Sequence, residues 1–267
     1  AYNYIKQSKF TKAKNYFNRA IVQINRSSFQ NPFIKDQILL DAHLRLGDCY
    51  FKENNYAKAL ENYDRVDFSN NQNYVYALYQ KAIIKGLKGN QVDKVIDLEN
   101  IEKRYPDSKY ADDALYELGL TYLEIGEFNK ARRPLDKLVL NYRDRSELAN
   151  QAYLKLGLIA YNQGSTQNAV KYYKSCLSNN PSPSEKNNAL IALKEIYIDD
   201  LGDPDSYFAL TEEITGYSYS ETGKDSLNYR VAERQYEQGN YAEAVREFGQ
   251  YISKYPKGIF ILPAHYY

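Results

Sequence analysis

The sequence predicts an all-α solenoid of antiparallel helix pairs, and two observations carry that prediction. Glycine, proline and alanine recur at a fixed interval of 75 residues, and apolar residues recur between them at helical spacing. The recurring positions are Gly89, Gly164 and Gly239; Pro106, Pro181 and Pro256; Ala114, Ala189 and Ala264. Gly126 stands midway between Gly89 and Gly164, so the 75 residues hold two units of 37 or 38 residues. Periods of this size are typical of solenoids, whose extended surfaces usually serve recognition.

Residues 115–138 show how one unit forms two helices. The first apolar stripe consists of Leu115, Leu118, Gly119 and Tyr122, and the second of Phe128, Ala131, Leu135 and Leu138. Both have the spacing of one helix face. Gly126 ends the first helix because glycine accepts a left-handed backbone without steric penalty, and small Ala131 lets the two helices approach closely. One such pair cannot bury its apolar face alone, so the copies must stack.

Other copies follow in order along the chain. Their marker residues are Leu46, Gly47, Tyr50, Ala59 and Tyr63 in the second unit; Tyr153, Leu156, Gly157, Ala169 and Tyr173 in the fifth; Ala232, Ala244 and Phe248 in the last. The copy at residues 77–105 is weaker, with Ala82 in place of glycine and Lys94 in place of alanine. The weakest copy spans residues 189–214, where Pro204 after Asp203 predicts a capped start of a short second helix.

These positions resemble the tetratricopeptide repeat, with Leu118 and Gly119 at the Leu-Gly pair of that family, Tyr122 at its tyrosine and Ala131 at its alanine. The resemblance covers essentially the whole chain and implies a right-handed superhelix. The units are longer than the usual roughly 34 residues. The joining segment 105–114 resembles that of bacterial cell-envelope members, such as the periplasmic protein of the Tol-Pal system and the lipoprotein of the β-barrel assembly machinery. This implies a periplasmic or outer-membrane-associated protein, with the cytoplasm as the alternative.

The repeat pattern predicts a single solenoid over residues 1–267, with about seven helical hairpins and a partial repeat at each end. A loop or bend is expected at 216–224, because Gly216 and the following tyrosines and serines interrupt the helical spacing. Ala1–Gln7 aligns with the end of a first helix and Ala264–Tyr267 with the start of another, and neither shows a polar cap. We therefore expect a segment of a longer array. Abundant Tyr, Asn, Lys and Ile suit a Bacteroidetes source.

The composition argues against several classes of partner. Lys and Arg number 35 and Asp and Glu 34, for a net charge of +1, so the chain has no basic stripe for nucleic acid. The longest apolar runs fall well short of the roughly 18 residues of a membrane-spanning helix, so no membrane insertion of this segment is expected. Cys49 and Cys176 lie about three repeats apart on apolar helix faces, which predicts two buried structural thiols and no disulfide between them.

Residues suited to catalysis or metal binding are scarce. Of the two histidines, His43 takes a helix-packing position, and neither has a second histidine or cysteine at metal-ligand spacing. No phosphate-binding loop is present. An acidic group formed by Asp199, Asp200, Asp203 and Asp205 lacks the spacing of a calcium loop, so helix capping is favoured. Asp112 and Asp113 fall in the first turn of a helix, where the helix dipole favours acids. We expect no enzyme, no cofactor and no metal.

First helices line the concave groove of tetratricopeptide arrays, and the resemblance places a stripe of tyrosines and leucines there. The candidate binding residues are Tyr76, Tyr79, Tyr116, Leu120 and Tyr161, with Asp48, Glu195 and Glu233 tuning charge at the ends. Packing against the next helix is the competing interpretation of the stripe. Some family members clamp the terminal carboxylate of a peptide. That clamp is not expected in this chain, because the fifth position of every first helix is apolar or aromatic. The residues there are Leu44, Tyr79, Tyr116, Leu154, Ile191 and Tyr229.

Together these patterns favour a non-catalytic scaffold that binds a protein or peptide along its concave face, in bacterial envelope assembly or maintenance. The alternative is a non-catalytic accessory region of a larger envelope enzyme that acts on peptidoglycan. A catalytic motif in flanking sequence would favour the accessory region, and further repeats would favour the scaffold.

Overall fold

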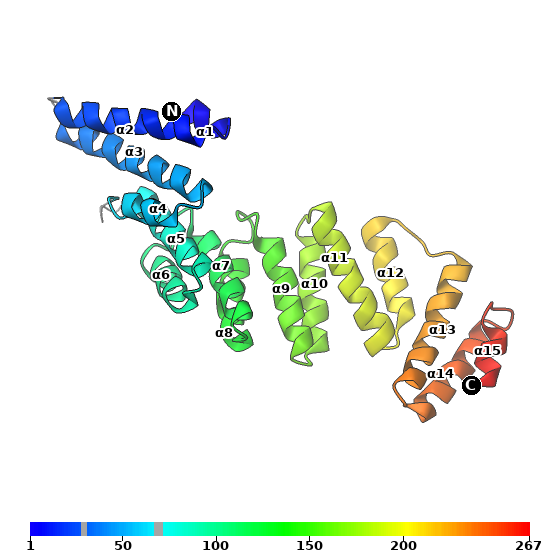
Figure 1. Cartoon of the computed structure of the whole chain (residues 1–267). Helices are drawn as coiled ribbons and strands as arrows, with labels where there is room; N and C mark the ends of the chain where they lie inside the picture. The colour runs from blue at the N-terminus through cyan, green and yellow to red at the C-terminus, as the bar shows by residue number, and fades with distance from the viewer. Residues whose placement is uncertain (28–30, 67–71) are drawn as a thin grey trace. The chain divides into compact units, whose positions relative to one another are not determined.

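The computed structural model describes residues 1–27, 31–66 and 72–267, and this part of the chain is helical with no strand. The all-α prediction is confirmed. The residues cluster into two compact units, Ala1–Leu148 and Ala149–Tyr267. In each unit, successive helices run antiparallel and pack as pairs (Figure 1). No described helix has the length and apolar character needed to cross a bilayer.

The first unit holds α1 to α8. The bounds are α1 Tyr2–Lys6, α2 Phe10–Arg26, α3 Pro32–Lys52, α4 Tyr56–Tyr63, α5 Gln72–Leu87, α6 Gln91–Arg104, α7 Ala111–Glu124 and α8 Phe128–Asn141. The pairs α3/α4, α5/α6 and α7/α8 correspond to three sequence repeats, with the first helix of each pair named first. Asn31 begins α3 with a side-chain cap, since its Oδ1 accepts from the backbone N–H of Phe33 at 3.0 Å.

The second unit holds α9 to α15. The bounds are α9 Ala149–Asn162, α10 Thr166–Ser178, α11 Pro183–Glu195, the π-helical turn η1 Ile196–Asp200, α12 Pro204–Thr215, α13 Glu221–Glu237, α14 Tyr241–Lys254 and α15 Ile261–Tyr266. The expected cap is present, because Asp203 Oδ1 accepts from the N–H of Ser206 at 3.1 Å. Residues 216–220 join α12 to α13 without helical structure, and α13 begins inside the range 216–224 expected for a loop or bend.

The repeated glycines end first helices as predicted. Gly89, Gly126, Gly164 and Gly239 all have φ between 72° and 80°, a left-handed backbone. At each, the next residue donates its N–H to the carbonyl five residues earlier, as from Glu127 to Tyr122 at 2.8 Å. Asn54 takes this role in the α3/α4 pair with φ +58°, and Asn55 donates to Tyr50 at 2.9 Å. Asparagine is one of the few residues other than glycine that adopts this conformation readily.

Close contacts within each pair explain the Leu-Gly positions. A Cβ added at Gly47, Gly119 or Gly157 would lie 2.5–2.6 Å from the nearest side-chain atom of the partner helix. The alanines of the second helices are buried, among them Ala131 and Ala169. Lys94 stands at that alanine position in α6 and is also buried, with its ammonium 2.5 Å from Glu117. Gly86 makes room for it, since a Cβ there would lie 2.6 Å from Lys94 Cδ.

Candidate binding face

The candidate residues of the first unit lie on its first helices, α3, α5 and α7. Tyr76 and Tyr79 are three residues apart on α5, and Tyr116 and Leu120 are four apart on α7, so each pair shares a helix face. All four side chains are partly buried, between core and solvent. We call Tyr76, Tyr79, Tyr116, Leu120 and the neighbouring Tyr110 the tyrosine face.

Asp48 on α3 accepts hydrogen bonds beneath this face. Its Oδ1 accepts hydrogen bonds from the hydroxyls of Tyr63 at 2.9 Å and Tyr76 at 2.8 Å. Its Oδ2 accepts from the Arg45 guanidinium at 2.8 Å. Burial, together with the negative charge of Asp48, raises the pKa of both tyrosines well above the ordinary value of 10.0. Asp48 therefore holds α3, α4 and α5 together, and these neighbours already satisfy its charge.

Tyr110, the residue just before α7, joins the two tyrosines of α5. Its ring centroid lies 5.1 Å from that of Tyr76 and 6.3 Å from that of Tyr79, with the Tyr79 ring nearly parallel at 16°. The Tyr79 hydroxyl has no hydrogen-bond partner among residues 1–27, 31–66 and 72–267. Burial and the carboxylates of Glu117, Asp113 and Asp112 raise its pKa. The rings therefore contact one another, and the described residues leave the phenol of Tyr79 without a hydrogen bond.

Tyr110 was not predicted from the sequence, although the repeat contained a signal for it. Tyr79 and Tyr110 stand 150 residues before Tyr229 and Phe260, which is two periods of the recurrence. Tyr229 and Phe260 also stack, with centroids 4.5 Å apart and an interplanar angle of 14°. An aromatic pair between one first helix and the start of the next is therefore part of how these repeats pack.

The fifth positions of the first helices differ in exposure. Leu44 and Tyr229 are core residues, 1% and 6% exposed, whereas Ile191 is 58% exposed. Tyr79, Tyr116 and Leu154 are intermediate. The side chains of Tyr79 and Tyr116 are therefore neither core residues like Leu44 nor largely exposed like Ile191.

The second unit contains the other three candidates. Tyr161 on α9 is partly buried; its burial and a hydrogen bond to Asp200 raise its pKa to about 12, and Glu195 adds to the shift. Glu195 itself is exposed at the end of α11. Glu233 on α13 pairs with Arg230 at 3.2 Å. Glu195 therefore lies near Tyr161, whereas Glu233 contacts an arginine of its own helix.

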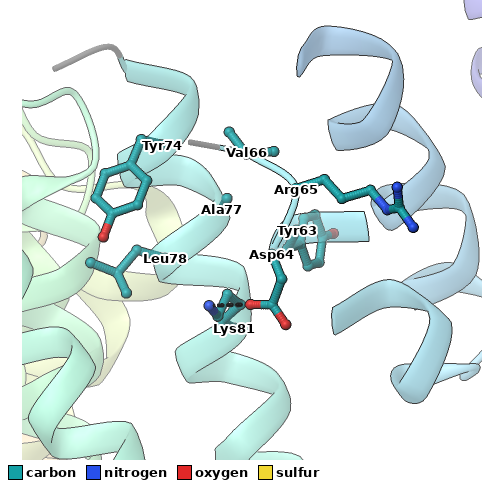
Figure 2. Close-up of a pocket in the computed structure, with 8 residues that line it drawn as sticks. All are labelled: Tyr63, Asp64, Arg65, Val66, Tyr74, Ala77, Leu78 and Lys81. Atoms are coloured by element: carbon teal, nitrogen blue, oxygen red, sulfur yellow. Dashed lines mark hydrogen bonds and ion pairs between the residues drawn. The ribbon is translucent and has the colours of Figure 1, made fainter. Parts of the chain in front are cut away.

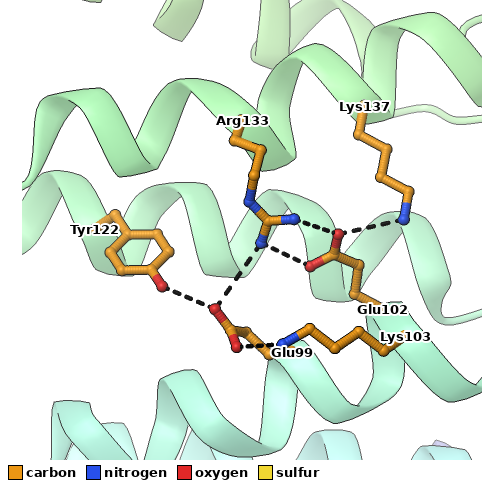
Figure 3. Close-up of polar contacts among 6 residues, drawn as sticks. All are labelled: Glu99, Glu102, Lys103, Tyr122, Arg133 and Lys137. Atoms are coloured by element: carbon orange, nitrogen blue, oxygen red, sulfur yellow. Dashed lines mark hydrogen bonds and ion pairs between the residues drawn. The ribbon is translucent and has the colours of Figure 1, made fainter.

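Two further features lie outside the predicted residues. A cavity of about 470 Å³ between α4 and α5 is lined by Tyr63, Asp64, Arg65, Val66, Tyr74, Ala77, Leu78 and Lys81 (Figure 2). Its lining includes none of the candidates, and its Lys81 ammonium pairs with Asp64. An ion-pair cluster joins α6 to α8, where the Arg133 guanidinium contacts both carboxylate oxygens of buried Glu102 at 2.7 and 2.9 Å (Figure 3).

The histidine and cysteines considered for catalysis or metal binding lie in packed, partly or fully buried positions. His43 Nδ1 lies 3.1 Å from Asn62 Oδ1, and burial lowers its pKa below 6.5. Cys49 and Cys176 are free and buried, which confirms their structural placement, and burial raises their pKa values to about 11 and 12. Three or more potential metal ligands gather nowhere in the described ranges.

Comparison with known proteins extends the repeat resemblance. Models of the tetratricopeptide repeat match residues 113–182, 41–66 and 225–258. A search of curated proteins gave no match.

Solved structures resemble the chain in fold. The C-terminal part of a TPR repeat-containing protein from Cytophaga hutchinsonii aligns with a TM-score of 0.58 at 13% identity, covering 98% of this chain and 96% of that one. BtubC from P. vanneervenii aligns with a TM-score of 0.57 at 14% identity, covering 79% of this chain and 94% of that one. A tetratricopeptide repeat protein from Parabacteroides merdae aligns with a TM-score of 0.51 at 17% identity, covering 94% of this chain and 89% of that one. With its helix pairs and glycine turns, the chain carries tetratricopeptide repeats at the matched residues, and its all-α fold is that of tetratricopeptide repeat proteins.

Proposed function

We propose that the chain is a non-catalytic scaffold and that the tyrosine face of its first unit binds a segment of a partner protein. Tetratricopeptide folds generally mediate interactions between proteins over extended surfaces. The carrying observation is the group of partly exposed rings at Tyr76, Tyr79 and Tyr110, whose member Tyr79 has a hydroxyl without a partner in the described part of the chain.

Physical chemistry favours such a face as a contact surface. Tyrosine offers a large apolar area and a hydroxyl while losing few rotatable bonds on binding. Leu120 and Tyr116 extend the apolar area along α7. Packing accounts for the buried part of each ring, since the Tyr229 and Phe260 pair shows the same stack in a core position. The exposed parts of the rings and the Tyr79 hydroxyl are not used in packing, so they can contact a ligand.

The cellular setting is part of the proposal. The joining segment 105–114 resembles that of envelope members of the family, so we place the function in assembly or maintenance of a bacterial envelope, at the periplasm or outer membrane. The test is fractionation of the source cell with an antibody against the chain, where a cytoplasmic signal would contradict this placement.

Selection of short random peptides on the immobilised full chain tests the binding face. Peptides that bind the parent are measured against Tyr79→Ser/Tyr116→Ser and, separately, Leu120→Ser. Val92→Ser/Ile96→Ser is the matched control, because these α6 side chains are 71% and 58% exposed on a second helix. We expect loss of about tenfold or more in affinity for the face variants and no change for the control. Equal binding by all variants with unchanged helicity contradicts the proposal.

A further inference from the structure

Basic residues are concentrated at the start of the chain. Residues 1–35 contain seven of the 35 basic residues and none of the 34 acidic ones. In the rest of the chain, acidic residues outnumber basic ones by six, so the overall net charge of +1 conceals the difference. Such an asymmetry is typical of proteins of which one end meets an extended anionic partner. In the structure, the basic segment forms α1, α2 and the start of α3.

Three of these bases form a row along the outer side of α2. Lys12, Arg19 and Arg26 stand seven residues apart, so they share one side of the helix, opposite buried Phe17. All three are exposed, and Tyr16 on the same side is 47% exposed. We call Lys12, Arg19 and Arg26 the basic row, which is about 21 Å long at the rise of an α-helix. The expectation that the chain has no basic stripe is therefore wrong for α2.

The described part of the chain leaves the basic row without acidic partners. Lys14, also on α2, pairs with Glu53 on the turn after α3. No acid among residues 1–27, 31–66 and 72–267 lies within ion-pair distance of Lys12, Arg19 or Arg26. Successive members of the row are about 10 Å apart along the helix axis, too far to converge on one small anion. The row therefore fits an extended anionic partner better than a single phosphate or carboxylate.

Apolar side chains are exposed beside the basic row. Val22, between the last two members of the row, is 47% exposed. No side chain in residues 32–41 of α3 is buried, and Phe33 and Ile34 there are 69% and 49% exposed. Because α2 and α3 run antiparallel and adjoin in sequence, the end of α2 and the start of α3 lie together (Figure 1). Basic and apolar groups therefore meet at one end of this helix pair, where Asp36 is the first acid of the chain.

A membrane surface uses both kinds of group. Phosphates of anionic lipids attract the basic row, while exposed apolar side chains enter the boundary between headgroups and acyl chains. A nucleic-acid backbone or a run of acidic residues would use the cations but leave Val22, Phe33 and Ile34 in water. We infer that α2 and the start of α3 dock on a bilayer surface that contains anionic phospholipid, without crossing it. This surface is separate from the tyrosine face on α5 and α7, so the inference goes beyond the proposed function and does not depend on it.

Co-sedimentation of the full chain with lipid vesicles tests the inference. One set of vesicles contains phosphatidylcholine and phosphatidylglycerol in equal amounts, and the other contains phosphatidylcholine alone. We expect the parent to bind only the anionic set, and Lys12→Gln/Arg19→Gln/Arg26→Gln to weaken this binding about tenfold or more. Phe33→Ser/Ile34→Ser should weaken it as well, and its effect should depend less on salt, which screens charge but not apolar contact.

A matched control separates the basic row from the net charge of the chain. Lys88→Gln/Lys171→Gln/Lys257→Gln removes the same charge from exposed lysines elsewhere, none of which forms an ion pair with a described acid. This control should bind the anionic vesicles as the parent does. Circular dichroism should show equal helicity for the parent and all three variants, because every replaced side chain is exposed.

Three results overturn the inference. If the parent binds both vesicle sets equally, or neither, the chain does not recognise anionic lipid. Equal weakening by the basic-row variant and the control would assign the effect to net charge. Row-dependent binding to polyglutamate or duplex DNA that is tighter than binding to the anionic vesicles would assign the row to an acidic protein segment or a nucleic acid. None of these results bears on peptide binding at the tyrosine face, which the Tyr79 and Tyr116 variant tests separately.

Discussion

Single glycines decide how closely the two helices of a repeat approach. Gly157 on α9 faces the ring of Tyr173 on α10, and a Cβ there would lie 2.6 Å from the nearest ring carbon. Tyr173 is buried, so the ring has no free space into which to move. Gly249 on α14 is the opposite case, an exposed helical glycine with nothing within 4 Å of an added Cβ.

Gly157→Ala should therefore destabilise the second unit by about 1–3 kcal/mol through overpacking. Gly249→Ala should stabilise it by about 0.5–1 kcal/mol, since alanine is the better helix former. Urea denaturation followed by circular dichroism measures both. If the two variants shifted stability in the same direction, the contact between Gly157 and Tyr173 would not limit the approach of the helices.

At the scale of elements, one ion-pair cluster ties neighbouring repeats of the first unit together. Glu102 on α6 is buried and is held by Arg133 and Lys137 on α8, with Lys137 at 3.2 Å (Figure 3). Glu99 adds contacts to the hydroxyl of Tyr122 at 3.0 Å and to Lys103 at 2.8 Å. Burial alone would raise the pKa of Glu102, but the hydrogen bonds and charges of Arg133 and Lys137 outweigh it and lower the pKa.

Because the folded pKa of Glu102 lies below the unfolded value of about 4.3, its stabilisation is present above that pH. It is lost as the pH falls through the folded pKa. Glu102→Gln should therefore lower the free energy of unfolding by about 1–2 kcal/mol near pH 7, a range reduced because Arg133 is half-exposed. The difference between parent and variant should disappear as the pH falls through the lowered pKa of Glu102.

Hydrogen exchange of the backbone amides in residues 91–104 and 128–141 measures this loss of stability locally. Glu61→Gln is the matched control, since its pair with Arg65 is exposed on both sides and should contribute less than about 0.5 kcal/mol. A difference between parent and Glu102→Gln that stays constant from neutral to acidic pH would show that the charge of Glu102 is not what stabilises α6 against α8.

At the scale of the whole molecule, periodicity in the sequence was enough to predict the helix pairs, their glycine turns and their buried alanines. It could not predict contacts that depend on a particular partner from another helix. Buried Lys94 needs both the space left by Gly86 and the charge of Glu117, and Asn54 replaces a glycine through its own tolerance of a left-handed backbone. These local exceptions keep the fold while departing from the repeat pattern.

The candidate site was predicted in part. The sequence placed tyrosines on the first helices, but helical spacing alone does not say how far a ring is covered by the next repeat. Tyr110 was missed because it lies before its helix, although comparison of residues two periods apart would have revealed it. The pairing of Asp48 with Arg45 was within reach of the sequence, since the two stand three residues apart on one helix.

The central claim is that ligands bind the first helices of the first unit. The most direct measurement is photo-crosslinking of a selected peptide carrying benzoyl-phenylalanine, with mapping of the crosslinked fragments of the full chain. Binding to the first helices predicts crosslinks in residues 72–87 and 111–124, the helices α5 and α7. Crosslinks concentrated in 91–104 and 128–141, the second helices α6 and α8, would contradict it.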